Sequence, residues 1–417
     1  MFLRNFAKIL RFIMNKQYTM KRLVITNGRL MLPDGVVATD LVLICASGKI
    51  ESIISKEQYE TLEGDEVIDA EGRYVAPGFI DLHVHGGGGH DFMDCTVEAF
   101  LGALKAHAKH GTTGLLPTTL TCPDDELFQS FEVYREAEKL NTEGAQMLGM
   151  HLEGPYFNPS MAGAQDPKYL VPPRRQHYME ILEKGGDVIS RWSAAPELEG
   201  SLELAQELKK HNILVSVAHT CAIYEEVAEA YKAGFSHMTH FYSATSTLTR
   251  KNARRYAGAV EAAYMHDDVT VEVIADGVHL IKPLLQYVYK FKGADRTALC
   301  TDAMRAAGMP EGESILGSLK KGQPVIVEDG VAKLMDRSAY AGSVATADRL
   351  VRTMINIAEV PLTDAVKMLT ATPARIMGLQ DKKGSLKVGL DADVILFDEN
   401  ISIDKTIISG NVVYSAR

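Results

Sequence analysis

The pattern of apolar and polar residues differs between the middle of the chain and its two ends. From residue 76 to 379, short apolar runs of strand length alternate with amphipathic stretches of ten or more residues. This alternation predicts parallel βα units. The candidate strands are residues 78–85, 112–119, 145–154, 187–197, 213–219, 237–242, 269–277 and 297–303. Eight such units predict an α/β fold of the (β/α)8 TIM-barrel type, with a doubly wound open sheet as the alternative.

Two of the segments between the strands carry helix signals. Residues 97–111 and 221–234 are amphipathic, and each ends in a glycine. Glycine commonly terminates a helix because it adopts the left-handed backbone conformation at little cost. We therefore expect a helix in each of these segments.

Both ends of the chain have a sequence pattern that is typical of β-sheets. Residues 21–75 and 380–417 consist of short β-type runs broken by Gly and Asp, with strand cores at 394–397 and 406–408. Because the termini of a domain often lie close together, we expect both ends to build one small β-sandwich domain. The barrel, residues 76–379, would then be inserted in it.

The first twenty residues are both apolar and basic. Arg4, Lys8 and Arg11 interrupt the apolar run, which is atypical of a secretory signal. A short amphipathic helix on a membrane surface is one interpretation, and a disordered tail over residues 1–20 is the one we favour. Elsewhere no segment reaches the ~18 consecutive apolar residues of a membrane span, so we expect no membrane partner.

Composition narrows the class of protein. The 417 residues are 46% hydrophobic and 24% charged, as in a soluble globular protein. A net charge of −10 and the lack of a long basic block argue against a nucleic-acid partner. The five cysteines are scattered and form no CxxC motif, which favours reduced thiols and a cytoplasmic location over disulfides or a thiolate zinc site.

Metal-binding and acid–base side chains collect where the predicted strands end. They are His83, His85, His151, Glu153, His219, His237, His240, Asp276, His279 and Asp302. In a barrel, the carboxyl ends of the strands form the active-site face. His83 and His85 point the same way because they are two residues apart on a strand, so they can bind one ion. Glycines 86–89 let the backbone turn closely beside it.

Each of these residues also has a purely structural interpretation. An isolated HxH pair is a weak signal, and His219 or His240 alone is typical of a hydrogen-bonded histidine. Cys221 and Cys300 fit as packing residues, since neither has an obvious partner base. Packing alone does not readily explain why five strand ends carry a His, a Glu, two further His and an Asp. Their conjunction predicts a metal-dependent hydrolase.

The chemistry of such a set can be stated directly. A divalent metal ion held by Glu153, His219 and His240 would lower the pKa of a bound water toward about 7 and polarise a carbonyl. Asp302 would take a proton from that water and pass it to the leaving group. A leaving group that needs a proton is a poor one, such as an amine. The sequence therefore predicts hydrolysis of an amide or related C–N bond.

Several motifs give the chain a specific resemblance. APGFIDLHVHG and the late GSLKVGLDADVILFD resemble the amidohydrolase superfamily. HLEGPYFNP, APE, AHT, MTH, IADGVH, TDA and YAGS, in this order, resemble the N-acetylglucosamine-6-phosphate deacetylase family. The resemblance covers nearly the whole chain. It implies a barrel with a small β-sandwich, a homodimer, and hydrolysis of the acetamide of N-acetylglucosamine 6-phosphate to glucosamine 6-phosphate and acetate.

The resemblance also implies roles for individual residues. Glu153, His219 and His240 would bind the metal ion, and Asp302 would be the general acid/base. Because His83 and His85 are present, a second ion bridged by Glu153 is expected, so the cofactor would be one or two zinc or iron ions per chain. The implied substrate-binding residues are Ala164, Gln165, Ser243, Ala244, Lys251, His279, Tyr340, Ala341 and Gly342.

Three departures from the family pattern bear on the substrate. Gln165 stands where the family has a histidine that polarises the substrate carbonyl, and glutamine donates a hydrogen bond but not as a cation. Residues 243–245, Ser-Ala-Thr, replace Asn-Ala-Met. Residues 250–255, RKNARR, replace the segment that supplies a phosphate-binding arginine. That segment is either a phosphate site, in its own chain or across the dimer, or a solvated basic loop.

Two alternatives to this activity remain open. One is a deacetylase of another N-acyl amino-sugar phosphate, such as N-acetylgalactosamine 6-phosphate, or another cyclic amidohydrolase. The other is a catalytically silent barrel that serves as a binding protein. The intact DGVH and LEGP segments favour sugar phosphates, and the presence of every expected metal ligand favours an enzyme.

Overall fold

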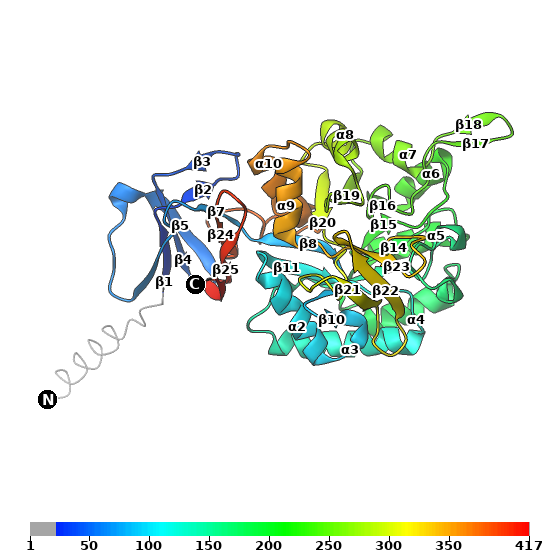
Figure 1. The fold of residues 1–417 in the computed structure, drawn as a ribbon, viewed down its shortest axis with the longest axis horizontal. Helices are drawn as coiled ribbons and strands as arrows, with labels where there is room; N and C mark the ends of the chain where they lie inside the picture. The colour runs from blue at the N-terminus through cyan, green and yellow to red at the C-terminus, as the bar shows by residue number, and fades with distance from the viewer. Residues whose placement is uncertain (1–21, 417) are drawn as a thin grey trace, which may run out of the picture.

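The computed structural model describes residues 22–416, which form a helix-covered barrel with a β-rich domain beside it (Figure 1). The predicted tail, residues 1–20, lies outside the described residues. Within residues 22–416, none of the helices combines the length and apolar character needed to cross a bilayer.

Eight parallel strands close into a ring. In hydrogen-bonded order, which is also chain order, they are β8 (Phe79–Val84), β11 (Thr112–Pro117), β13 (Met150–Glu153), β14 (Ile189–Ala194), β15 (Leu214–Val217), β16 (Phe235–Met238), β19 (Thr270–Ile274) and β20 (Thr297–Cys300). The pairings of Thr118 with His151 and of Val84 with Ala303 join the ends of the two constituent sheets. The (β/α)8 prediction is therefore confirmed, and the open-sheet alternative is wrong.

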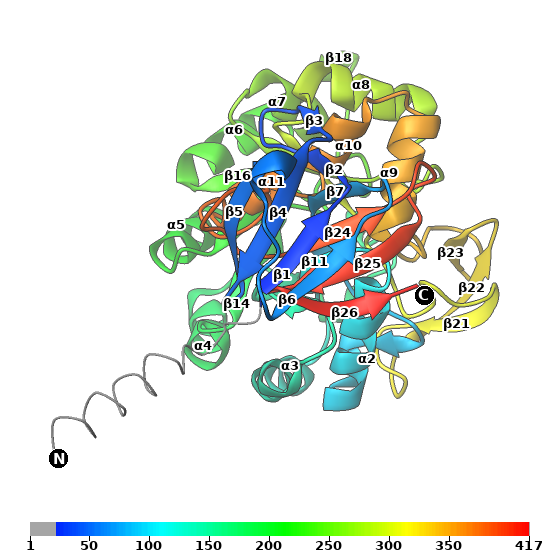
Figure 2. The same ribbon diagram turned by 90° about the vertical axis from the view of Figure 1, so that its left-hand side faces the viewer.

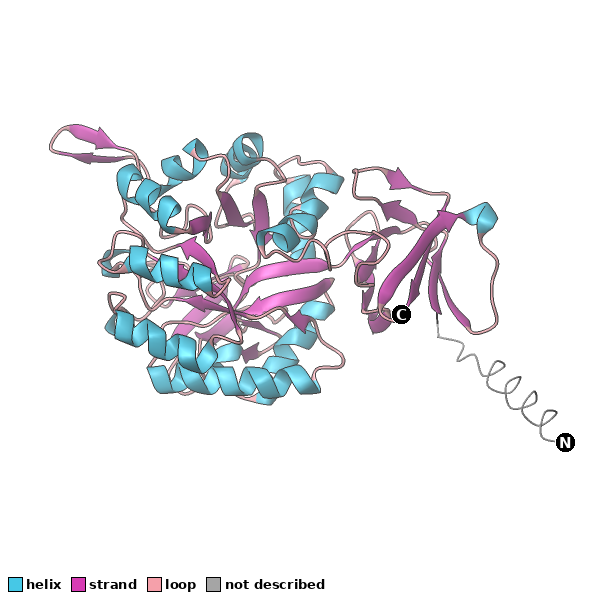
Figure 3. Ribbon diagram, turned by 180° about the vertical axis from the view of Figure 1, so that it is seen from behind, coloured by secondary structure: helices cyan, strands magenta, loops and turns pink. Residues whose placement is uncertain are grey.

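Helices cover the outside of the ring (Figure 3). They are α2 (Val97–Ala108), α3 (Asp124–Leu140), α4 (Arg175–Gly185), α5 (Ser201–Lys210), α6 (Tyr224–Ala233), α7 (Ala259–Met265), α8 (Lys282–Lys292), α9 (Ala347–Asn356), α10 (Leu362–Lys367) and α11 (Ala371–Ile376). The helices predicted at 97–111 and 221–234 are α2 and α6. α2 begins at Thr96, whose hydroxyl accepts the Ala99 N–H, and α6 ends at Gly234 with φ of 131°.

The third predicted strand is interrupted. Residues 145–154 form β12 (Gln146–Met147) and β13 rather than one strand. Gly149 lies between them with φ of 101°, and a side chain there would collide with Ser190. Only glycine tolerates this conformation and this close approach, so the chain bends before Glu153 is delivered at the end of β13.

The two ends of the chain build a pair of sheets (Figure 2). One has the order β5-β4-β1-β6 and the other β26-β25-β24-β7-β2-β3. The strands are β1 (Arg22–Thr26), β2 (Arg29–Met31), β3 (Val37–Ala38), β4 (Leu41–Ala46), β5 (Lys49–Ser55), β6 (Asp65–Asp69), β7 (Tyr74–Pro77), β24 (Val394–Phe397), β25 (Ile403–Ile408) and β26 (Asn411–Ser415). Leu23, Leu43, Val75 and Leu396 from both sheets share one core.

The pairing of β7 with β24 joins the two ends of the chain, with Val75 opposite Leu396. This arrangement confirms the β-sandwich built from both termini. The strand β7 runs through Pro77, two residues past the predicted boundary at residue 75. The precise division into 21–75, 76–379 and 380–417 stays a prediction.

Two β features beside the barrel have no counterpart in the sequence analysis. The antiparallel sheet of β21 (Gly312–Leu316), β22 (Gln323–Glu328) and β23 (Val331–Leu334), called the flap here, has its own small core. The hairpin of β17 (Thr249–Lys251) and β18 (Arg254–Tyr256) projects from the far end of the barrel (Figures 1 and 3). Arg305 connects the flap to the barrel. It donates hydrogen bonds to both carboxylate oxygens of Asp94, at 2.9 and 2.8 Å, and to the carbonyl of Gly317, which directly follows β21. The short strands β9 (Gly86–Gly87) and β10 (His90–Asp91) form a separate antiparallel pair.

Candidate metal centre and substrate pocket

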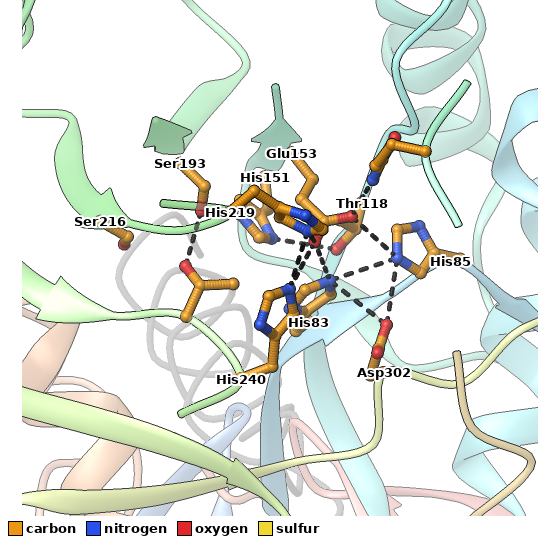
Figure 4. A network of polar contacts seen from close by, with 12 residues as sticks. His83, His85, Thr118, His151, Glu153, Ser193, Ser216, His219, His240 and Asp302 are labelled. Atoms are coloured by element: carbon orange, nitrogen blue, oxygen red, sulfur yellow. Dashed lines mark hydrogen bonds and ion pairs between the residues drawn. The ribbon is translucent and has the colours of Figure 1, made fainter. Parts of the chain in front are cut away.

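Five strand ends deliver the predicted metal ligands and Asp302 to one place. His83 lies near the end of β8 and His85 just beyond it, while Glu153 is the last residue of β13. Three further side chains follow their strands by two residues: His219, His240 and Asp302. Figure 4 shows the side chains turned toward a common centre. Parallel strands of a barrel end at one face, which is why residues far apart in the chain meet here.

Glu153, His219 and His240 form the first potential metal site. The Nε2 atoms of His219 and His240 lie 3.2 Å apart, and they are 3.3 and 2.9 Å from Oε1 of Glu153. All three side chains are buried. Two atoms each about 2.1 Å from a tetrahedral ion are separated by about 3.4 Å, so this spacing fits a metal ion.

His83, His85 and Glu153 form a second potential metal site beside the first. The two Nε2 atoms are 3.2 Å apart, and His85 Nε2 is 3.3 Å from Oε2 of Glu153. Glu153 therefore turns Oε1 toward His219 and His240 and Oε2 toward His85, while His83 Nε2 lies 3.6 Å from Oε1. This is the arrangement expected of a carboxylate that bridges two ions.

The protonation of the histidines suits metal binding. His219 Nδ1 lies 2.7 Å from the Met161 carbonyl, and His83 Nδ1 lies 2.9 Å from a Glu272 carboxylate oxygen. Both partners only accept hydrogen bonds, so each Nδ1 carries the hydrogen and each Nε2 presents a lone pair to the centre. Burial opposes a charge on His83, yet Asp302 and Glu153 raise its pKa well above the ordinary value. The carboxylates around His83 thus favour a positive charge at this place, which a metal ion bound to Nε2 would supply instead of the proton.

Asp302 lies at the edge of the second cluster. Its Oδ1 is 3.1 Å from His85 Nε2 and 3.4 Å from His83 Nε2. Burial alone would raise the pKa of Asp302, but the two histidines lower it below its usual value, which leaves a carboxylate able to accept a proton. Gly342 approaches closely, because a Cβ there would lie 3.0 Å from the Asp302 carbonyl oxygen.

The backbone at this face is strained. His219, His240 and Asp302 have φ of 46°, 27° and 47°, in the left-handed region that residues other than glycine seldom adopt. Such strain persists only where surrounding contacts enforce it, and it concentrates at functional sites. All three are among the residues that sequence analysis assigns to the chemistry.

A cavity of about 220 Å³ opens onto the cluster. Seven of the predicted substrate-binding residues line it: Ala164, Gln165, Ser243, Ala244, His279, Tyr340 and Gly342. His279 is oriented by Asp276, whose Oδ2 lies 2.7 Å from its Nδ1, and its ring lies 4.8 Å from that of Tyr340. The pocket therefore combines a polar metal-binding floor with an imidazole and a phenol ring in its wall.

Two predicted substrate contacts are not among the described residues that line the cavity. Ala341 is not among the residues that line the cavity, and its side chain packs in the flap core with Met304 and Leu316. Lys251 has its backbone in β17, and its side chain lies outside the described residues. Its assignment as a substrate contact stays a prediction.

Sequence reasoning missed part of the pocket wall. Leu120, Gly163, Ile274, Leu316 and Ala339 also line the cavity. Leu120 follows the second predicted strand and Ile274 lies within the seventh, so their position near strand ends was a usable signal. Leu316 and Ala339 belong to the flap or the turn after it, for which the chain carries no recognised motif.

Comparison with known proteins identifies the family. Residues 74–413 match the model of the amidohydrolase family. The N-acetylglucosamine-6-phosphate deacetylase of Bacillus subtilis (strain 168) is 32% identical over 397 residues, 94% of each chain. The chain belongs to the N-acetylglucosamine-6-phosphate deacetylase family of amidohydrolases.

Other relatives support this family assignment. The N-acetylglucosamine-6-phosphate deacetylase of Lysinibacillus sphaericus is 34% identical, with 88% of this chain and 91% of the relative covered. An N-acetylgalactosamine-6-phosphate deacetylase of Escherichia coli O157:H7 is 31% identical, with coverages of 83% and 89%. The structure of a mutant Mycobacterium smegmatis deacetylase in complex with N-acetyl-D-glucosamine-6-phosphate aligns with a TM-score of 0.84 at 26% identity, covering 95% of this chain and all of that one.

Proposed function

We propose that this chain hydrolyses the acetamide of N-acetylglucosamine 6-phosphate, releasing glucosamine 6-phosphate and acetate. The observation that carries the proposal is the convergence of Glu153, His219, His240 and Asp302 on one cavity at the mouth of the barrel. Family membership points to the same reaction, since relatives over most of the chain are named for it.

The metal ligands, Asp302 and the residues of the cavity wall would have different roles in this reaction. Glu153, His219 and His240 would hold one divalent metal ion, and His83, His85 and Glu153 a second. Metal ions at such a site activate water and polarise a carbonyl. Asp302 accepts one proton of the attacking water and transfers it to the nitrogen of the departing amine as the C–N bond breaks. The products are the neutral amine and acetic acid, which loses its remaining proton to solvent and becomes acetate. His279 and Tyr340 position the sugar against the wall of the cavity.

We propose zinc or iron as the metal, with up to two ions per chain. The sharing of Glu153 between two histidine pairs supports two ions. Imidazole and carboxylate ligands accommodate both metals, so the donor set supports either one.

We propose that the phosphate is bound by the hairpin β17–β18, in a homodimer. Arg250, Arg254 and Arg255 are exposed on this hairpin, which projects away from its own barrel. Exposed apolar side chains also occur at the base of the hairpin and on α7 and α8: Leu248, Met265, Ile281, Tyr287 and Phe291. Large exposed apolar groups near an extended arm support a second copy of the chain docking there.

We further propose a reducing compartment, the cytoplasm. All five cysteines are free thiols, and Cys45, Cys95 and Cys300 are buried among core residues. Thiols maintained in this state are typical of cytoplasmic proteins.

A second candidate substrate is N-acetylgalactosamine 6-phosphate. The Escherichia coli relative named for this epimer supports it. So does Ser243-Ala244-Thr245 beside the cavity, because this segment lacks the side-chain amide that the N-acetylglucosamine family pattern has there.

A rate comparison tests the assignment. Acetate release is measured with the 6-phosphates of N-acetylglucosamine, N-acetylgalactosamine and N-acetylmannosamine, and with the unphosphorylated sugars. We expect the highest kcat/KM for N-acetylglucosamine 6-phosphate. A higher value for the galacto epimer would transfer the assignment to it, and equal rates with and without phosphate would exclude a sugar-phosphate substrate.

A further inference from the structure

A layer of charged and polar side chains lies inside the barrel, behind the metal ligands. Glu272 of β19, Arg191 of β14 and His237 of β16 belong to it, and each has no solvent exposure. Burying charge is costly unless every charged group is paired and hydrogen-bonded. The proposed reaction assigns no role to these residues.

Glu272 and Arg191 form a two-point ion pair. Arg191 Nη1 donates to Oε2 of Glu272 at 2.6 Å, and Nη2 donates to Oε1 at 2.9 Å. The guanidinium is itself fixed, because Nη1 also donates to the Leu82 carbonyl at 2.9 Å and Nη2 to the Thr239 hydroxyl at 2.8 Å. The carboxylate is therefore held in a single orientation.

This carboxylate contacts a ligand of each potential metal site. Oε1 of Glu272 lies 2.9 Å from Nδ1 of His83 and accepts the backbone N–H of His240 at 3.2 Å. A carboxylate beside a guanidinium accepts hydrogen bonds only, so the His83 ring must carry its hydrogen on Nδ1. Its Nε2 lone pair then points at His85 Nε2, 3.2 Å away, and at Glu153.

We propose that Glu272, held by Arg191, is a positioning residue that sets the tautomer and orientation of His83 and so creates the second metal site. This inference deepens the proposed function and rests on it, since it assigns a purpose to the His83 and His85 pair. Without Glu272 the His83 ring has no fixed partner behind it, and Nε2 is free to carry the hydrogen. A protonated Nε2 cannot bind a metal ion.

A different role for Glu272, as a ligand of its own ion, conflicts with its contacts. His83, Glu272 and Cys300 do place one potential ligand atom each within 4.8 Å of one another. The Arg191 guanidinium, however, already occupies both carboxylate oxygens and would repel a cation.

Cobalt titration of the metal-free chain tests the proposal. Co²⁺ binding is followed by calorimetry and by visible absorption, which reports ligand geometry independently of activity. We expect two ions to bind to the wild type. In Glu272→Leu, which removes the acceptor behind His83, the first ion binds as before, and the second binds about 10- to 100-fold more weakly, the usual effect of losing a partner behind a metal ligand.

Two further variants keep the test decisive. Because Glu272→Leu leaves the Arg191 charge unpaired and can prevent folding, Arg191→Met/Glu272→Leu removes both charges together and carries the same prediction. His237→Gln is the matched control: His237 is equally buried and lies 3.4 Å from Oε2 of Glu272, but it contacts neither His83 nor His85. It should keep both ions.

The outcomes separate this inference from the proposed function. Unchanged binding of the second ion in the folded double variant would overturn the inference, as would an equal loss in His237→Gln or a wild type that binds one ion. Acetate release by the wild type is measured in parallel. Its absence would overturn the proposed function but would leave the two-ion titration able to support the role of Glu272.

Discussion

Gln165 donates a hydrogen bond from Nε2 to Oε2 of Glu153 across 2.7 Å. Its Oε1 is equally engaged, because it accepts the backbone N–H of Thr121 at 2.8 Å and the Thr121 hydroxyl at 2.9 Å. The amide is thus anchored at one end and orients the shared carboxylate at the other. A residue expected to contact the substrate carbonyl also steadies the metal ligand that both sites share.

Replacing Gln165 therefore has a definite consequence. Gln165→Leu keeps most of the volume but removes the donor to Glu153, and we expect kcat/KM and metal affinity to fall about 10- to 100-fold. Gln165→His, which restores a donor, should retain more activity than Leu. Gln323→Leu is the control, since Gln323 donates to the neighbouring Ala164 carbonyl without contacting a metal ligand. Equal effects of Gln165→Leu and Gln323→Leu would contradict this role.

Asp302→Asn removes the proton carrier while preserving shape. An amide cannot accept a proton from water at neutral pH, so we expect kcat to fall by about 10²- to 10⁴-fold. The metal content of the purified variant, measured by elemental analysis, should equal that of the wild type. Near-normal turnover would exclude Asp302 as the general acid/base.

The barrel and the convergence of its polar strand ends were predictable because their signals are local. Strand length, apolar alternation and a polar residue at each strand end follow from how parallel strands meet at one face, which is why His219 and His240 could be found. The flap could not be found, since its residues pack mainly against one another and carry no motif. The motif YAGS does not tell which of its residues line the cavity, so the difference between Ala341 and its neighbours Tyr340 and Gly342 could not be predicted.

The contacts of Glu272 could not be predicted from the sequence either. A charged residue between Val271 and Val273, in a strand buried on both sides, signals a functional or paired carboxylate. Its partner, Arg191, is 81 residues away in another strand. Only the closed ring brings the two together, so neither the pairing nor the contact with His83 follows from the sequence.

If the basic hairpin β17–β18 binds the phosphate, its arginines should affect only the phosphorylated substrate. Arg254→Ala and Arg255→Ala should raise KM for the phosphorylated substrate and leave kcat nearly unchanged, because each removes a charge-assisted hydrogen bond to phosphate. The weak hydrolysis of unphosphorylated sugar should be unaffected. Lys382→Ala, at an exposed lysine after the last helix of the barrel, is the control. A similar change in KM for both kinds of substrate would rule out phosphate binding by the hairpin.

The β-sandwich contains an ion pair that should affect stability and not catalysis. Arg22 Nε and Nη2 bond the two carboxylate oxygens of Asp65 at 2.8 and 2.9 Å, and these bonds lower the pKa of Asp65 to about 2. Asp65→Asn should reduce the free energy of unfolding by about 1 kcal/mol at neutral pH. Glu51→Gln, whose carboxylate lies 3.8 Å from Arg22, should cost less.

The pH dependence of that difference follows from the sign of the shift. The unfolded chain protonates Asp65 near its ordinary pKa of about 3.9, so the stabilisation is complete above about pH 4. It is lost as pH falls toward about 2, where the folded form is protonated as well. Urea unfolding of the wild type and of Asp65→Asn at several pH values measures the difference in their free energies of unfolding. A difference that persists at pH 2 would contradict the assignment.

The central claim is that histidines and a glutamate from separate strands hold a metal ion that makes water reactive toward an amide. Acetate release from N-acetylglucosamine 6-phosphate, measured before and after chelation and again after stoichiometric return of Zn²⁺ or Fe²⁺, tests it most directly. We expect activity to disappear with the metal and to return in proportion to the metal bound, with a parallel rise in melting temperature because the ion binds the folded chain. Undiminished hydrolysis by protein that elemental analysis finds free of metal would contradict the account.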